Sequence, residues 1–331
     1  MSSRPRIALI STGGTIDSLG HDRTDLAFYT EARSRLPEGE LLAAVPEITE
    51  VADIEPVPFE RVPSYQLSVQ SWATLVQTVQ QLTCDSPCDG VVITHGTNSL
   101  EETAFLLSLT VDCLKPVVVV GAMRPFNALA ADGPLNLLQA VRLAASPHAL
   151  GHGVLVVSND TIFAGRDVAK ATTFRADAFT GADMGPVGHV EADGSVDLRM
   201  RHDSNSTPVF DVGDVARMPR VDVVISYVGA DGALIDAAVA AGARGIVSAG
   251  TGGGRPTAAE DEALERAVRA GVVVCQSTRV PTGKVLRSPQ MKAAGKVVAG
   301  ARPAWQARIA LALALTRSQQ PDEVQTYLDR L

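Results

Sequence analysis

The sequence has few aromatic residues, few cysteines and no long apolar run. Aromatic residues make up 4% of the 331 positions. No apolar segment approaches the ~18–20 residues that a membrane-spanning helix needs. The N-terminus carries two arginines but neither the apolar segment nor the small-residue cleavage site of a signal peptide. We therefore expect a cytoplasmic protein that does not bind membranes.

Basic residues are also scarce relative to acidic ones. Lys and Arg number 29 against 37 Asp and Glu, which gives a formal net charge of −8. An acidic chain is a poor match for nucleic acid or an anionic membrane. Hydrophobic residues make up 46% of the chain and charged residues 20%, which is ordinary for a globular protein with one large domain or two smaller ones.

The four cysteines do not form a recognisable metal site. Cys84 and Cys88 make a C-x3-C pair, but no second pair and no histidine stand at ligand spacing, so we predict no zinc site. The cysteines are more typical of small buried hydrophobic residues. Whether Cys84 or Cys88 pairs with Cys113 is left open.

The apolar segments alternate between strand and helix patterns. Short β-branched runs without polar alternation predict parallel strands buried on both faces, at 7–11, 91–94, 117–121 and 154–158, and again at 221–229, 245–250 and 272–278. Helices are predicted at 69–82, 99–110, 134–145, 257–271 and 303–318. Ser99 and Glu102 have the spacing of a capping box, which would start the second helix.

A segment rich in turn-forming residues interrupts this alternation. Residues 160–215 predict a short hairpin and long loops, and the polar, proline-containing stretch at 201–219 is typical of a linker. The sequence thus predicts two α/β domains with mostly parallel sheets, at 1–200 and 220–331.

Two strands end in unusually polar loops. The first runs into "STGGTID" (11–17) and the second into "THGTN" (94–98). In open α/β sheets, ligands bind beyond the carboxyl ends of the strands. Gly13 and Gly14 permit a sharp turn or a close backbone approach to a ligand, and exposed backbone N–H groups there form an anion site. No glycine loop fits the dinucleotide or Walker patterns, so a nucleotide is not expected.

Threonine hydroxyls beside glycines suggest nucleophilic catalysis. An alcohol is a weak nucleophile at neutral pH and needs a neighbouring base. The candidate bases are His95, Lys170 and a phenol such as Tyr29 or Tyr227. A single threonine at a strand end is more often structural, and His95 is more often a hydrogen-bonded loop residue. The two loops together favour the catalytic interpretation.

The chain resembles the bacterial-type L-asparaginase/glutaminase family over nearly its whole length. The matching stretches are "STGGTI" (11–16), "VVITHGTNSLEETAFLLSLT" (91–110), "KPVVVVGAMRP" (115–125), "ADGPLNLLQAV" (131–141), "GVLVVSNDTIFAGRDVAK" (153–170), "GIVSAGTGGG" (245–254) and "STRVPTG" (277–283). The resemblance implies two α/β domains with flavodoxin-like sheets. It also implies a threonine amidohydrolase that needs no metal or organic cofactor.

The resemblance also implies roles for individual residues. Thr15 would attack the carboxamide to give an acyl-enzyme and ammonia, supported by Tyr29, although Phe28 beside it leaves that register open. Thr97 and Lys170 match two members of a second catalytic triad. Which threonine attacks first stays open. Gly14 and Gly96 would lie against the substrate, and the loop that carries Gly96 and Thr97 would supply oxyanion-hole donors.

Several matching positions depart from the family pattern around the substrate's α-ammonium group. Asn98 replaces the aspartate that holds this group, which removes a negative charge. Ser64 matches the substrate-binding serine, but Tyr65 replaces the glutamine that follows it. Gln290 is the nearest match to a glutamate that a neighbouring subunit contributes. These changes lead to the hypothesis that the preferred amide lacks a free α-ammonium: succinamate-like, N-acylated or larger.

Other functions remain as alternatives. An amidase for a larger amide would have an open first loop at 17–35, whose content is polar and charged. A catalytically silent homologue would keep the fold and bind a small ligand. A subunit acting on aminoacylated tRNA is disfavoured by the acidic charge.

Family members assemble as tetramers of intimate dimers, so the resemblance implies a homo-oligomer with a small-molecule amide as its substrate.

Overall fold

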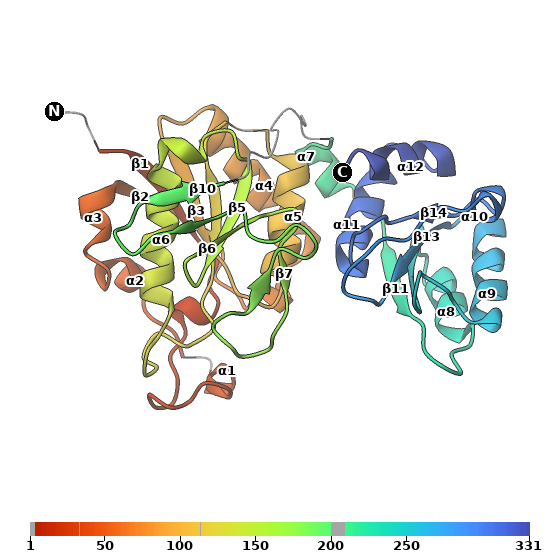
Figure 1. The fold of residues 1–331 in the computed structure, drawn as a ribbon, viewed down its shortest axis with the longest axis horizontal. Coiled ribbons are helices and arrows are strands. Elements are labelled where there is room, and N and C mark those ends of the chain that lie inside the picture. The colour runs from red at the N-terminus through yellow and green to blue at the C-terminus, as the bar shows by residue number, and fades with distance from the viewer. Residues whose placement is uncertain (1–3, 33, 113, 200–208) are drawn as a thin grey trace. The chain divides into compact units, whose positions relative to one another are not determined.

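The computed structural model describes residues 4–32, 34–112, 114–199 and 209–331. The chain divides into two compact units, Met1–Pro208 and Val209–Leu331. Each unit is a sheet with helices on both faces (Figure 1). Among the described residues, no helix is long and apolar enough to cross a membrane.

The sheet of the first unit is flavodoxin-like. Its strand order is β10-β9-β6-β5-β4-β3-β1-β2, and the five strands from β2 to β5 are parallel. These five are β1 (Arg6–Ser11), β2 (Asp53–Val57), β3 (Gly90–Thr94), β4 (Val117–Val120) and β5 (Val154–Ser158). The order 2-1-3-4-5 is that of flavodoxin-like folds, so the predicted fold class is confirmed.

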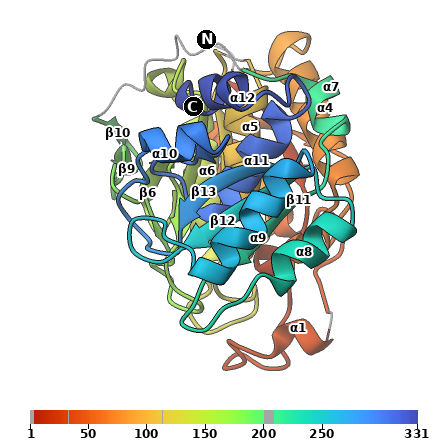
Figure 2. The ribbon, with the colours of Figure 1, turned by 90° about the vertical axis from the view of Figure 1, so that its right-hand side faces the viewer.

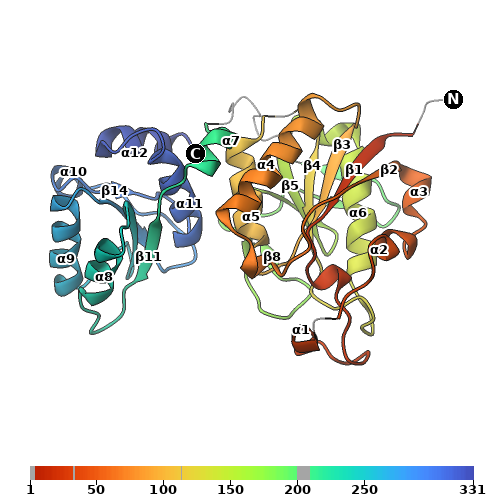
Figure 3. The ribbon, with the colours of Figure 1, turned by 180° about the vertical axis from the view of Figure 1, so that it is seen from behind.

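Helices cover both faces of this parallel sheet. Figure 3 shows α4 and α5 on one face and α2, α3 and α6 on the other. Residues 91–93 and 117–120 are fully buried, which explains why these strands show no polar alternation. The helices are α1 (Tyr29–Ala32), α2 (Glu40–Ala43), α3 (Ile48–Val51), α4 (Val69–Cys84), α5 (Leu100–Thr110) and α6 (Gly133–Ala145), with 3-10 turns at Thr15–Asp17, Ser64–Gln66 and Pro147–Ala149.

The turn-rich segment contributes antiparallel strands, as the sequence predicted. Asn159 and Asp160 join β5 to β6 with φ of 51° and 61°, which is the geometry of a tight hairpin turn. A second hairpin joins β9 to β10 through the turn that contains Gly194. The strands are β6 (Thr161–Ala164), β7 (Ala169–Lys170), β8 (Phe179–Thr180), β9 (Gly188–Val190) and β10 (Val196–Leu198).

Two local predictions need correction, and one strand was not predicted. The Ser99 side chain does not cap α5; its hydroxyl donates to the Ser64 carbonyl at 2.8 Å, because a tertiary partner competes with the local one. Strand β2 escaped notice because it contains Pro56, which an edge strand tolerates. The predicted strand at 221–229 ends at Ile225.

The second unit has a four-stranded parallel sheet in the order β11-β12-β13-β14. Helices α8 and α9 cover one face and α11 the other (Figure 2). The strands are β11 (Val221–Ile225), β12 (Gly245–Gly250), β13 (Val273–Thr278) and β14 (Val297–Val298). The helices are α7 (Val212–Ala216), α8 (Ala233–Ala240), α9 (Ala258–Arg269), α10 (Pro289–Ala293), α11 (Ala304–Ala314) and α12 (Pro321–Asp329).

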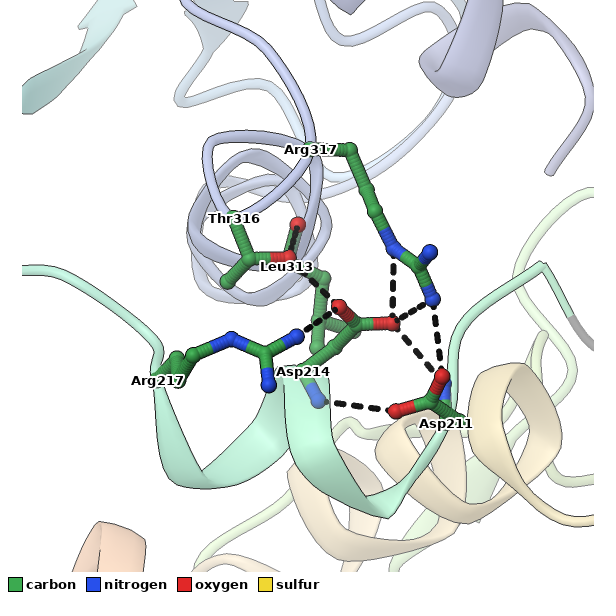
Figure 4. Close-up of polar contacts among 6 residues, drawn as sticks. All are labelled: Asp211, Asp214, Arg217, Leu313, Thr316 and Arg317. Atoms are coloured by element: carbon green, nitrogen blue, oxygen red, sulfur yellow. Dashed lines mark hydrogen bonds and ion pairs between the residues drawn. The ribbon is translucent and has the colours of Figure 1, made fainter.

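Part of the predicted linker is an ordered element of the second unit. Helix α7 is held by Asp214, whose side chain is fully buried (Figure 4). Asp214 accepts hydrogen bonds from Arg317, from Arg217 at 3.0 Å and from Thr316 at 2.9 Å. Burial opposes ionisation, but the bonds from Arg317 and the other donors lower the pKa of Asp214 below its usual value. The predicted linker at 201–219 therefore includes α7, and its residues 201–208 lie outside the described residues.

The cysteines are free wherever the structure describes them. Cys84 is exposed, and Cys88 and Cys275 are buried. Cys113, whose pairing with Cys84 or Cys88 the sequence leaves open, lies outside the described residues.

Candidate active site

A cavity of about 540 Å³ lies in the first unit beyond the carboxyl ends of β1 and β3. The strand order reverses at β1 and β3, which is where flavodoxin-like sheets bind their ligands. The cavity is lined by nine of the ten predicted site residues: Thr15, Tyr29, Thr97 and Lys170, together with Gly14, Ser64, Tyr65, Gly96 and Asn98. The tenth, Gln290, lies in α10 of the second unit, where its side chain is exposed.

The first threonine is paired with a phenol. Thr15 begins the 3-10 turn after β1 and is 9% exposed. Its Oγ1 lies 2.8 Å from the hydroxyl of Tyr29 in α1. Burial raises the pKa of Tyr29 above its usual value, so the phenol stays protonated at neutral pH. The structure brings Tyr29, and not its exposed neighbour Phe28, to this threonine.

The second threonine is paired with an amine. Lys170 Nζ donates to Thr97 Oγ1 at 2.9 Å and lies 3.5 Å from Asn98 Oδ1. The backbone N–H of Lys170 donates to the Glu101 carboxylate at 3.0 Å, which fixes β7 against α5. Burial lowers the pKa of the Lys170 amine, and the negative charge of Glu101 opposes that shift. An amine whose pKa is lowered is better suited to accept a proton near neutral pH.

Two glycines let the threonine loops approach one another. Gly14 has φ of 112°, and a Cβ there would lie 2.5 Å from the Gly96 Cα. A Cβ at Gly96 would lie 2.7 Å from the Ser64 hydroxyl. A larger residue at Gly14 would push the two loops apart, and one at Gly96 would displace Ser64.

Ser64 lines the cavity and has a buried hydroxyl without a hydrogen-bond partner among the described residues. The residue is 5% exposed, and its Oγ has no hydrogen-bond partner among the residues that the structure describes. Buried polar atoms are nearly always hydrogen-bonded, so an orphan hydroxyl in a cavity wall indicates a ligand contact. Tyr65, the next residue, is 62% exposed and also lines the cavity.

His95 has a structural role, because both of its ring nitrogens contact protein atoms. Its side chain is fully buried, with Nδ1 2.8 Å from the Gly96 carbonyl and Nε2 2.9 Å from the Thr103 hydroxyl. Thr103 also accepts from the Trp72 indole at 3.0 Å. Burial lowers the pKa of His95 to about 4, so the imidazole is neutral at pH 7. Tyr227, the other phenol considered as a base, lies in the second unit and is 53% exposed.

Sequence reasoning missed two arginines in the cavity wall. Arg61 pairs with Asp17 at 2.6 Å, and Arg35 Nη1 donates to the Arg61 carbonyl at 2.8 Å. Both side chains line the cavity, as does Phe174 after β7. The charged content of 17–35 was a signal for Arg35 alone, and nothing in the local sequence indicated that Arg61 would face the cavity.

This geometry defines the class of protein. A flavodoxin-like sheet brings two threonine hydroxyls, a half-buried amine and a serine hydroxyl without a partner among the described residues to one cavity. This arrangement is suited to a hydrolase that attacks a carbonyl. The comparisons identify the family. The family model of the N-terminal asparaginase domain matches residues 6–203, and that of the glutaminase/asparaginase C-terminal domain matches 220–328. The chain belongs to the asparaginase/glutaminase family, whose members are amidohydrolases acting on linear amides.

Individual relatives agree with this assignment. L-asparaginase 2 of Escherichia coli is 38% identical over 98% of this chain and 93% of its own length. A glutaminase-asparaginase of Pseudomonas aeruginosa is 36% identical over 96% of this chain and 88% of its own. The crystal structure of a probable cytoplasmic L-asparaginase from Campylobacter jejuni superposes with a TM-score of 0.92, at 35% identity, over 98% of this chain and 99% of the other.

Proposed function

We propose that the chain hydrolyses a side-chain carboxamide to the acid and ammonia through a threonyl ester. Thr15 Oγ1 bonds to the carboxamide carbon while its proton passes to a neighbouring base, and the base gives this proton to the carboxamide nitrogen as the C–N bond breaks and ammonia leaves. Water then attacks the ester carbon, the bond to Thr15 breaks, and the acid leaves. The observation that supports this most is the pair of contacts in one cavity, Thr15 with Tyr29 and Thr97 with Lys170.

The two pairs have different parts in this proposal. Tyr29 is protonated and orients the Thr15 hydroxyl. Lys170, acting through Thr97, takes the proton of the Thr15 hydroxyl and gives it to the leaving nitrogen in the first half-reaction; in the second it takes a proton from water and returns it to the Thr15 oxygen. Backbone N–H groups of the Gly96–Thr97 loop stabilise the oxyanion. One such donor is worth about 3 kcal/mol in other hydrolases.

Replacing each threonine tests the mechanism. We expect Thr15→Val to lower kcat for ammonia release by at least about 10³-fold, because the nucleophile is lost. Mass spectrometry after rapid acid quench should place the acyl adduct on the peptide that contains Thr15. Thr74→Val, on an exposed position of α4, is the control. An adduct on Thr97, or an active Thr15→Val, would reject Thr15 as the nucleophile.

The second candidate is a catalytically silent homologue that binds a small ligand, which the orphan hydroxyl of Ser64 would serve equally well. It predicts ligand binding by calorimetry but no ammonia from any amide.

A homo-oligomer built of intimate dimers and a cytoplasmic location stay predictions, as does a role for Gln290 across a subunit boundary. Size-exclusion chromatography with light scattering measures the assembly directly.

A further inference from the structure

The cavity has an unusual charge for an acidic protein. Of the residues that line it, all of which the structure describes, three are basic and none is acidic. The basic ones are Arg35, Arg61 and Lys170. The chain as a whole carries −8. Arg61 is paired with Asp17, so the positive charge of Arg35 is the one in this wall that no carboxylate compensates among the described residues. Such a charge attracts negative charge locally and favours an anionic ligand.

The two nearest carboxylates are engaged elsewhere. The Asp17 side chain is 4% exposed and forms an ion pair with Arg61. Glu101 is 8% exposed, binds the Lys170 backbone N–H and lines an adjoining hollow. Neither lines the cavity, so a substrate ammonium there would face no carboxylate of the described residues in this wall.

Arg35 is placed to bind an anion. The segment 34–36 pairs with 17–19 through an antiparallel bridge between Ser18 and Arg35, and the Leu36 N–H donates to the Asp17 carbonyl at 2.8 Å. One nitrogen of the guanidinium, Nη1, donates to the Arg61 carbonyl. Arg35 forms no ion pair with any residue that the structure describes. An arginine has five N–H donors, so most remain available for a carboxylate.

The catalytic amine also disfavours a cationic substrate. Asn98, a neutral amide, lies 3.5 Å from Lys170 Nζ. When Lys170 takes the proton of a threonine it becomes an ammonium, and a substrate ammonium near Asn98 would then meet a like charge. A neutral or acylated nitrogen meets no such repulsion, and the Asn98 side chain can hydrogen-bond to it.

The size and rim of the cavity accommodate more than a four-carbon amide. Its volume of about 540 Å³ is within the range that holds drug-sized ligands. Two aromatic side chains line it while staying largely exposed, Tyr65 at 62% and Phe174 at 59%. Exposed aromatic side chains in a cavity wall are suited to covering an apolar group of a ligand.

We propose that the substrate is an anionic amide with an acylated α-nitrogen, of the N-acyl-asparagine class. Its carboxylate binds Arg35, its acylated nitrogen faces Asn98, and its acyl group lies against Tyr65 and Phe174. This inference rests on the amide hydrolysis proposed above and names the substrate of that site.

Competing substrates test the inference. We expect kcat/KM for ammonia release from N-acetyl-L-asparagine to exceed that from L-asparagine by at least 10-fold, with succinamate between them. A preference for L-asparagine would overturn the inference and leave the amide hydrolysis intact. If no amide releases ammonia, binding of the product N-acetyl-L-aspartate by calorimetry separates the two ideas. Tighter binding of this product than of L-aspartate supports the anion site, and equal or weaker binding rejects it.

Two variants test the residues. Arg35→Gln should raise KM for N-acetyl-L-asparagine about 10-fold with little change in kcat, since it removes a binding charge that does not touch the reacting atoms. Arg199→Gln, an exposed arginine paired with Asp197 and absent from the cavity wall, should change neither. Asn98→Asp should shift the ratio of kcat/KM about 10-fold toward L-asparagine. An unchanged KM in Arg35→Gln or an unchanged ratio in Asn98→Asp would contradict the assigned contact.

Discussion

At the scale of single residues, burial changes the pKa of two side chains in the same direction, yet their contacts give them different roles. His95 is fully buried and Lys170 is half-buried near the threonine loops, and desolvation lowers the pKa of each. The outcomes differ because of their partners. Both ring nitrogens of His95 contact protein atoms, whereas the Lys170 amine faces the cavity beside Thr97. Only Lys170 is therefore placed to exchange a proton with a substrate.

This contrast predicts how activity depends on pH. Burial favours the neutral amine, so kcat/KM should rise with pH as Lys170 loses its proton, with a midpoint below the ordinary value of 10.5. The negative charge of Glu101 raises the pKa of Lys170, so Glu101→Gln should move the midpoint to lower pH. The pH profile of kcat/KM measures both effects.

The control for the pH profile is Glu55→Gln, which removes an exposed acid paired with Arg6. It should leave the midpoint in place. A midpoint in Glu101→Gln that stays fixed or moves upward would show that another group limits the rate.

At the scale of elements, the candidate site lies at the carboxyl ends of β1 and β3, because the loops that follow these two strands meet there. The local pattern indicated the strands β1 and β3 and the glycines and threonines of the loops that follow them, since these depend on residues close in sequence. It did not indicate the Ser99 bond to the Ser64 carbonyl, which joins residues 35 positions apart. Strand β2 was hidden for a related reason, because its pairing with β1 is what makes it a strand.

The close approach of Gly14 to Gly96 predicts how much stability is lost when Gly14 is replaced. Gly14→Ala should destabilise the first unit by about 1–3 kcal/mol beyond the cost of its positive φ, because the new Cβ would lie 2.5 Å from the Gly96 Cα. Gly39→Ala is the matched control, since Gly39 also has a positive φ of 84° but a Cβ there would have no atom within 4 Å among the described residues. That variant should lose only about 1–2 kcal/mol.

Fluorescence can follow the first unit alone. The chain has two tryptophans, Trp72 in α4 and Trp305 in α11. In a Trp305→Phe background, urea unfolding monitored at Trp72 reports the free energy of unfolding of the first unit. Equal losses in the two glycine variants would show that the loops separate at little cost.

At the scale of the whole molecule, the chain is two units with separate cores. The candidate site lies in the first unit, and the buried Asp214 cluster of Figure 4 lies in the second. Removing one partner of a buried ion pair leaves a charge without compensation, which is strongly destabilising. The Asp214 cluster therefore stabilises the start of the second unit.

Arg317→Met tests this role. We expect it to lower the free energy of unfolding of the second unit by up to about 3 kcal/mol, with Arg217 compensating part of the Asp214 charge. Trp305 fluorescence in a Trp72→Phe background follows this unit. Arg220→Met, which removes a more exposed pair with Asp222, should cost at most about 1 kcal/mol. A similar loss in both variants would mean that burial of Asp214 adds nothing.

The sequence by itself determined the elements and the reactive groups of this protein. Buried strands, amphipathic helices and glycine-threonine loops follow from residues near one another in the chain, so the loop threonines and Lys170 could be named as candidates. The family resemblance then singled out Thr15, Thr97 and Lys170. Tertiary structure alone decided which groups face the cavity and which charges cancel. Arg61 is neutralised by Asp17, while Arg35 is left without an ion pair among the described residues. Such pairing depends on distances between segments far apart in the chain, which no local pattern encodes.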